Sequence, residues 1–194
     1  MHHTGHSEHT VTSYMVYFRQ LVSEMIDTDD TIIGGPGVVV QIDETMFGKR
    51  KYNRGHRVDG TWIIVDVEIT DERLLFAEVV PDRTAVTIEN VLSRHVAEGS
   101  IIHTDCWRGY SSISSRFNIE HRTVNHSLWF TDPHTGINTN TVEGNNYALK
   151  RHVPNRSRTE NKLQDYLLEF IWRRKYKLNL WRSFINALKE ISYN

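Results

Sequence analysis

The distribution of hydrophobic and polar residues along this chain predicts a five-stranded sheet. Five short runs are rich in Val, Ile and other apolar residues, a pattern typical of strands with at least one buried face. The runs cover residues 38–47, 61–70, 73–82, 100–105 and 119–125. A hairpin-length loop, "TDER", joins the second run to the third. We therefore expect the first three strands to follow one another in antiparallel order.

Five other segments repeat apolar residues at the 3.6-residue spacing of amphipathic helices. They cover residues 11–26, 84–96, 141–152, 160–174 and 178–191. We expect Thr12 or Ser13 to cap the first helix. The third should end before Pro154, because the residue before a proline disfavours helical geometry. Residues 27–37 combine acids, glycines and a proline and are predicted to be a linker.

The order of these elements predicts the fold. Three strands are followed by a helix, a strand, the helical or turn-like segment "WRGYSSISSRF", a fifth strand and further helices. Three antiparallel strands followed by β–α crossovers make a mixed α/β sheet with flanking helices, which is the order of the ribonuclease H-like fold. We predict this domain over residues 38–180, with C-terminal helices to residue 194. Residues 1–30 are predicted to form a tail and a short helix.

Composition narrows the class of protein. The chain has 194 residues, of which 39% are hydrophobic and 24% charged, as in an ordinary globular domain. No apolar run reaches the roughly 18–20 residues needed to cross a bilayer, and the N-terminus lacks the apolar core of a signal peptide. Cys106 is the only cysteine, which excludes an internal disulfide and a multi-cysteine zinc ribbon. We expect a protein of a reducing compartment that is not secreted and has no membrane partner.

The charge is unevenly distributed, although the net charge is only −1. Residues 48–57 are strongly basic, and residues 150–182 contain ten Lys and Arg against three acids. Local basic patches favour a nucleic-acid partner more than the global sum does. The alternative interpretation is a pair of solvated charged faces.

Three carboxylates occur in separate places that the predicted fold can bring together. Asp43 lies within the first strand, Asp105 ends the fourth, and Glu143 begins the third helix. Taken singly, Asp43 can be an exposed position on a strand, Asp105 can cap a helix, and Glu143 can be an acid favoured by the helix dipole. If the first and fourth strands are neighbours, however, Asp43 and Asp105 come close, and two close carboxylates need a counter-charge.

Divalent cations supply that counter-charge. Carboxylate oxygens and water suit Mg²⁺ or Mn²⁺. With Glu143 completing the site, two such ions can activate an attacking oxygen and stabilise the leaving oxygen at a phosphodiester. Lys150 follows Glu143 by seven residues, which places both on one face of a helix about 10.5 Å apart along its axis. From there Lys150 could hold a neighbouring phosphate, or it is an ordinary solvated lysine.

These residues match a known family. The segments "QIDETMFGKRKYNRGHRVDGTW", "IIHTDCWRGY", "VNHS" with the later "TNTVEG" and "LKR", and "LLEFIWRRKY" occur in the family's order. With them the chain resembles the DDE transposases of the Merlin superfamily and the related bacterial insertion-sequence transposases with an ISXO-type domain. The resemblance covers roughly residues 38–177. It implies that Asp43, Asp105 and Glu143 are the catalytic acids and that Lys150 is the basic residue that commonly follows the third.

The resemblance also implies an activity, a partner and a location. The expected enzyme is a metal-dependent DNA transposase, with a ribonuclease H-like fold, that cuts a strand at the element's ends and transfers it into target DNA. The expected partners are this DNA and further copies of the chain on it. The location would be the nucleus of a eukaryote, or otherwise the cytoplasm and nucleoid. A transposase-derived DNA-binding protein and a ribonuclease H-type nuclease are the alternatives.

The chain departs from the family at two places. Family members usually carry a DNA-binding region ahead of the first acid, so residues 1–30 are predicted to be a truncated form of it. They also often have an aromatic residue three positions after the third acid, where this chain has Asn146. We expect altered packing under the third acid as a result.

Phosphate contacts are expected from the basic residues near the carboxylates. The candidates are Lys49, Arg50, Lys51, Arg54, Arg57, Lys150 and Arg151. The loop before the third helix contains His126, which could be an auxiliary group beside the site.

Overall fold

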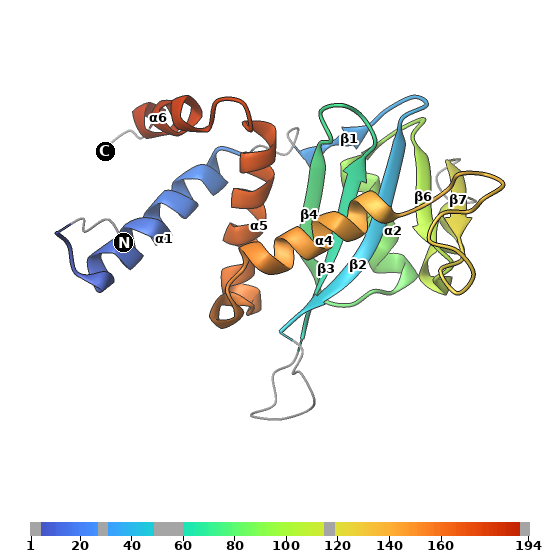
Figure 1. Cartoon of the computed structure of the whole chain (residues 1–194), viewed down its shortest axis with the longest axis horizontal. Helices are drawn as coiled ribbons and strands as arrows, with labels where there is room; N and C mark the ends of the chain where they lie inside the picture. Colours follow the sequence, from blue (N-terminus) through green and yellow to red (C-terminus); the bar gives the residue numbers. More distant parts are fainter. Residues whose placement is uncertain (1–4, 27–30, 49–59, 115–118, 191–194) are drawn as a thin grey trace.

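A computed structural model describes residues 5–26, 31–48, 60–114 and 119–190 (Figure 1). Its centre is a five-stranded sheet with the order β4-β3-β2-β6-β7. The strands are β2 (Val39–Phe47), β3 (Thr61–Glu68), β4 (Leu75–Val80), β6 (Ile101–Asp105) and β7 (Glu120–Val124). β2 and β4 are antiparallel to β3, whereas β6 runs parallel to β2 and β7 parallel to β6. This topology confirms the predicted ribonuclease H-like mixed sheet.

The middle of the sheet is buried on both faces. Successive residues Ile63, Ile64 and Val65 of β3 are all fully buried, although their side chains alternate between the two faces. A strand covered on both sides favours apolar residues at successive positions, and this explains the apolar residues 62–65 of the sequence. Polar side chains of β2 have hydrogen-bonding partners, and some of these partners belong to the site described below.

Helices cover both faces of the sheet. α2 (Ala85–His95) lies on one face, where the His95 ring stacks on Phe76 of β4 with 3.5 Å between ring centroids. α4 (Asn140–His152) lies on the other face and reaches Asp43 of β2 through Asn146. α5 (Glu160–Lys175) contacts both α4 and β4. The first and third acids therefore belong to the face that α4 covers.

Three helices form a lobe beside the sheet. α1 (Glu8–Glu24) and α6 (Leu180–Glu190) lie next to α5, at the end of the molecule opposite to β7 (Figure 1). Arg19 of α1 forms an ion pair with Glu169 of α5 at 2.9 Å, and Phe18 meets Phe184 of α6 edge to face. None of the described helices is long and apolar enough to cross a membrane. That residues 1–30 derive from a DNA-binding region stays a prediction.

The helix α1 begins earlier than the sequence predicts. Ser7, rather than Thr12 or Ser13, is its N-cap, and the Ser7 side chain accepts a hydrogen bond from the Thr10 N–H. The capping serine precedes the first apolar residues of the pattern, so the apolar spacing alone marks the start too late. The other predicted helices and strands begin and end within about two residues of the observed limits.

The predicted linker contains a short strand. β1 (Ile33–Gly34) pairs in parallel with β5 (Val96–Ala97), which follows α2 directly. Gly34 has a φ of 85°, and a Cβ at this position would lie 2.4 Å from Ser100 Oγ, so the close approach requires glycine. The turn-like segment after β6 contains the 3₁₀ helix η3 (Arg108–Tyr110), and a second one, η4 (Asn155–Ser157), separates α4 from α5.

Candidate active site

The first two carboxylates lie on neighbouring strands. Gln41 of β2 is paired with His103 of β6. Asp43 and Asp105 each lie two residues further along, and side chains two residues apart share one face of a strand. Both acids therefore lie on the same face, at the carboxyl end of β6. The first and fourth predicted strands are therefore neighbours, which is the condition under which Asp43 and Asp105 come close.

Gln41 also joins β2 to the helix that carries the third acid. The first N–H groups of a helix have no partner within it, and the N-cap residue Thr139 makes no side-chain cap hydrogen bond here. Gln41 Oε1 accepts from the N–H groups of Thr141, at 2.9 Å, and Val142, at 3.1 Å. These two bonds hold the start of α4 against β2, immediately before Glu143.

Asn146 connects the same helix to the first carboxylate. Its Nδ2 donates to Asp43 Oδ2 at 2.7 Å, and its side chain is buried. Residues three apart share a helix face, so Asn146 and Glu143 both face the strand that carries Asp43. The expected effect of an asparagine was altered packing under the third acid. The structure instead places it in contact with the first acid.

One cavity of about 310 Å³ contains all three carboxylates. Its lining residues are Ile42, Asp43, Asp105, His126, Phe130, Thr139 and Glu143. The Thr139 hydroxyl donates to Glu143 Oε1 at 2.8 Å, and His126 Nε2 lies 3.3 Å from the same oxygen. The structure thus places His126 beside the third acid, where it can hydrogen-bond or, when protonated, pair with it.

The charges of the cavity act on one another. Burial, together with the nearby charges of Glu44, Asp105 and Glu143, raises the pKa of Asp43 to about 6, although the Asn146 hydrogen bond opposes the rise. Asp105 is held by the Trp107 N–H, which donates to its Oδ1 at 2.8 Å. A cation in the cavity would offset the repulsion that Asp43 experiences.

Glu44 follows Asp43 in the sequence but points away from the cavity. The Tyr110 hydroxyl donates to Glu44 Oε2 at 2.8 Å, and Arg83 lies 3.9 Å from Oε1. Burial raises the pKa of Glu44. Because strand side chains alternate, the two adjacent acids serve opposite faces of the sheet.

Lys150 lies near the first acid rather than at the cavity wall. Its Nζ is 6.0 Å from the centre of the Phe47 ring, and burial lowers the pKa of Lys150 while the charge of Asp43 opposes this. Arg158 lies beside it, 5.5 Å from the same ring, and donates to the Lys150 carbonyl. Arg151 is exposed and lies over Tyr147 instead.

Comparison with known proteins decides the family. The model of the ISXO2-like transposase domain matches residues 21–175, most of the chain. The chain belongs to the ISXO2-like transposase domain family. Among solved structures it is similar to the catalytic core domain of BIV integrase, with 17% identity and a TM-score of 0.48 over 78% of this chain and 95% of that one. No match was found among curated proteins.

The carboxylates of the transposase domain line an open cavity and do not form a complete set of metal ligands. Within the described ranges, no three or more His, Cys, Asp or Glu side chains are grouped so that they could hold a metal ion. The oxygen-only donors nevertheless suit Mg²⁺ or Mn²⁺. The raised pKa of Asp43 also fits a site that a cation would stabilise.

The sequence did not predict several residues of the transposase site, among them Gln41, Thr139, Asn146, Arg158 and Phe130. Gln41 was open to prediction, because it lies two residues before Asp43 on the same strand face. Arg158 follows the Pro154 break, so no helical spacing relates it to Lys150. The basic residues 49–57, predicted as phosphate contacts, lie outside the described part of the chain.

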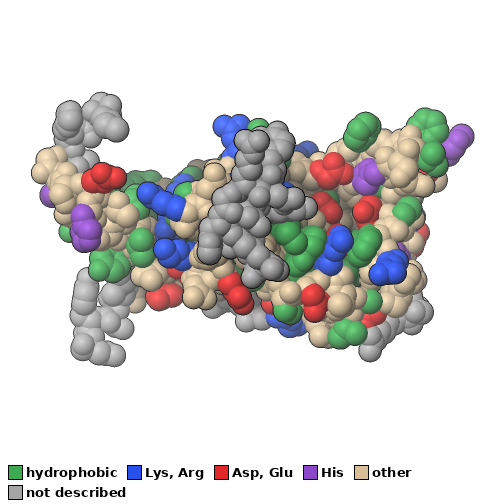
Figure 2. Space-filling model, turned by 90° about the horizontal axis from the view of Figure 1, so that it is seen from below, with side chains coloured by type: hydrophobic (Ala, Val, Ile, Leu, Met, Phe, Trp, Pro, Cys, Tyr) green, Lys and Arg blue, Asp and Glu red, His purple; other side chains and the backbone are tan. Residues whose placement is uncertain are grey.

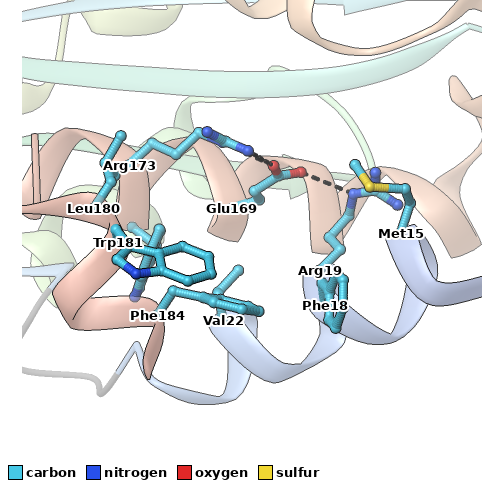
Figure 3. A pocket seen from close by; sticks show the side chains of 10 residues that line it. Met15, Phe18, Arg19, Val22, Glu169, Arg173, Leu180, Trp181 and Phe184 are labelled. Carbon is cyan, nitrogen blue, oxygen red and sulfur yellow. Dashed lines mark hydrogen bonds and ion pairs between the residues drawn. The ribbon is translucent and has the colours of Figure 1, made fainter. Parts of the chain in front are cut away.

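A second cavity, of about 320 Å³, lies in the helical lobe and contains none of the predicted site residues. Figure 3 shows its apolar side chains from α1 and α6, including Phe18, Trp181 and Phe184. Glu169 stands at its edge between Arg19 and Arg173 (Figure 3). Because the charged groups of this second cavity are paired with one another, the carboxylate cavity is the better candidate for a reaction site.

Proposed function

We propose that this domain is a metal-dependent DNA transposase that cuts a strand at the element's ends and transfers it into target DNA. The observation that carries the proposal is that Asp43, Asp105 and Glu143, from two strands and a helix, line one cavity in a chain of the ISXO2-like family. A bound cation would offset the repulsion between carboxylates held close to one another.

Each residue has a distinct part in this proposal. Asp43 and Asp105 would hold one Mg²⁺ or Mn²⁺ ion, and Asp43 and Glu143 a second. Bound there, the ions would activate the attacking oxygen and stabilise the leaving oxygen of the phosphodiester. Asn146 would keep Asp43 oriented, and Thr139 would do the same for Glu143.

The DNA partner would be held by basic residues around the cavity. Lys150 and Arg158 supply two positive groups beside Phe47, and Arg151 supplies an exposed one. Such contacts add affinity that falls with salt but carry little sequence information. We propose that the chain acts on DNA as a homo-oligomer, because two element ends must be joined to one target.

A strand-cleavage assay tests the proposal. The full chain is incubated with Mn²⁺ and duplexes carrying the DNA that flanks its coding sequence, and nicks and strand-transfer products are separated on denaturing gels. We expect cleavage by the unsubstituted chain and a loss of at least about a hundredfold in Asp43→Asn, because the removed charge is a metal ligand. Glu44→Gln is the matched control, since this adjacent acid serves the opposite face, and it should cleave normally.

Other outcomes distinguish the alternatives. DNA binding by the unsubstituted chain without cleavage would identify a transposase-derived DNA-binding protein. Preferential cutting of RNA–DNA hybrids would identify a ribonuclease H-type nuclease. Equal loss of cleavage in Asp43→Asn and Glu44→Gln would contradict the assignment of the cavity.

A further inference from the structure

The loop between β7 and α4, residues 125–139, exposes apolar side chains next to the carboxylate cavity. Leu128, Trp129 and Phe130 have exposed fractions of 66%, 50% and 79%. Hydrophobic side chains project from the end of the molecule that this loop occupies (Figure 2). Three consecutive exposed apolar residues are unusual on a protein surface unless they bind a partner.

The loop is held in place by its own hydrogen bonds. The N–H groups of Leu128 and Trp129 both donate to the Asn125 carbonyl at 2.9 Å, which closes a turn. Thr131 and Asn138 form an antiparallel bridge just after the aromatic residues. The exposed rings are therefore carried by a structured turn, which lowers the entropic cost of binding something against them.

Phe130 links this exposed surface to the chemistry of the site. It lines the cavity that contains Asp43, Asp105 and Glu143. A phosphodiester bound at those carboxylates would bring its own nucleotides against the Phe130 ring. A protein partner seated on the same ring would instead cover that side of the cavity, so a nucleic acid is the better fit.

We propose that Trp129 and Phe130 form a stacking site for an unpaired base next to the phosphate that is cut. This rests on the proposed function, because it requires DNA in the carboxylate cavity. Aromatic side chains stack on the flat faces of bases without reading their sequence. Inside a duplex, neighbouring bases cover both faces, so the site would favour DNA whose end is opened or distorted.

Binding to matched DNA probes tests the stacking site. The probes are a short blunt duplex and the same duplex with its terminal base pairs mismatched, with a fluorescent adenine analogue at the unpaired position. Asp43→Asn serves as the background, so that no probe is cut. We expect tighter binding of the mismatched probe and quenching of the analogue. Trp129→Ala and Phe130→Ala should each reduce the preference for this probe by about tenfold, with little change for the blunt duplex.

Conservative variants separate stacking from apolar contact. Phe130→Tyr keeps an aromatic face and should keep the preference, whereas Phe130→Leu keeps apolar bulk and should lose it. Tyr17→Ala is the matched control, because it removes an aromatic side chain with an exposed fraction of 62% from α1, in the lobe opposite to β7. It should leave both affinities unchanged. The side chains of Trp129, Phe130 and Tyr17 are all exposed, so thermal unfolding should be unaffected.

Several results would overturn the stacking site. A preference for the mismatched probe that survives in the Trp129→Ala, Phe130→Ala double variant would do so, and so would an undiminished preference in Phe130→Leu. A chain that sediments as a dimer, and that Phe130→Ala turns into a monomer with unchanged DNA preference, would show a protein interface instead. Cleavage by the unsubstituted chain without any preference would reject the stacking site alone, whereas absence of DNA binding and cleavage would reject the proposed function.

Discussion

Buried carboxyl groups show how far the surroundings of one residue decide its charge. The pKa of Asp43 is raised to about 6 by burial and by neighbouring acids, and a bound cation would reverse this. Asp66 lies at the centre of β3 and is fully buried, and burial raises its pKa to about 8. Neither of its oxygens has a hydrogen-bond partner among the described residues. Asp66 is therefore protonated in the folded protein at neutral pH.

The buried Asp66 predicts a specific pH dependence of stability. Above the ordinary pKa of 3.8, the unfolded chain loses the Asp66 proton while the folded chain keeps it. The free energy of unfolding should therefore fall as pH rises toward 8, by at most about 1.4 kcal/mol per pH unit from this group. Asp66→Asn removes the titration, so its stability relative to the unsubstituted chain should increase with pH. Urea unfolding at several pH values between 4 and 8 measures this.

A neighbouring exposed acid provides the control. Asp71 lies in the turn after β3, and Asp71→Asn should leave the pH dependence of unfolding as it is in the unsubstituted chain. A parallel pH dependence of Asp66→Asn and the unsubstituted chain would mean that Asp66 is not a buried neutral acid.

At the scale of elements, the site depends on how α4 is attached to β2. The helix supplies Glu143 and Asn146, and the side chain of its N-cap residue accepts no hydrogen bond from the first N–H groups of the helix. Gln41 provides the missing acceptor from a strand about one hundred residues earlier in the sequence. These hydrogen bonds hold α4 against β2 at the point where the first and third acids face the cavity.

Removal of this acceptor should affect stability and cleavage together. Gln41→Ala leaves the N–H groups of Thr141 and Val142 without their partner, so we expect a loss of about 1 kcal/mol in the free energy of unfolding. Cleavage should fall further than this loss explains, because Glu143 shifts with the helix. Urea unfolding and the Mn²⁺ cleavage assay measure the two effects. Gln41→Glu, which keeps a side-chain acceptor, should retain most of the stability; unchanged stability in Gln41→Ala would show that the helix does not need Gln41.

At the scale of the whole molecule, one buried acid joins the helical lobe to the sheet domain. Glu169 of α5 meets Arg19 of α1 at 2.9 Å and Arg173 of its own helix at 2.7 Å. His152, at the end of α4, lies 3.5 Å from the same carboxylate. Burial alone would raise the pKa of Glu169, but these partners lower it to about 2.

The depressed pKa of Glu169 predicts a loss of stability in acid. Its contribution is fully present above the ordinary pKa of 4.5 and is lost as pH falls toward 2. Glu169→Gln should therefore destabilise the protein at pH 7 by up to about 3 kcal/mol and by much less at pH 3. Chemical unfolding at both pH values measures the difference.

The matched control for Glu169 is Glu160→Gln, an exposed acid at the start of the same helix, which should have little effect at either pH. A Glu169→Gln penalty that is equal at pH 7 and pH 3 would contradict the role of its charge.

Much of the fold could be predicted because its signals are local. The apolar runs of β3 and β6 and the 3.6-residue spacing of α4 each lie within a short segment, and each specifies one element. The turn residues and the spacing between strands then limit the topology to few choices. The short pair β1 and β5 was missed because two-residue strands have no periodicity to detect.

The sequence by itself determined most of the elements and their order, because these depend on neighbouring residues, and it singled out the three acids as candidates. Only the tertiary structure decided what touches those acids: Gln41 at the start of α4, Asn146 on Asp43, and Phe130 in the cavity wall. It also decided that Asp66 is neutral and Glu169 charged, since burial and distant partners set each pKa. Such contacts join residues up to 150 positions apart, and they follow from strand register and helix docking, which residue spacing does not encode.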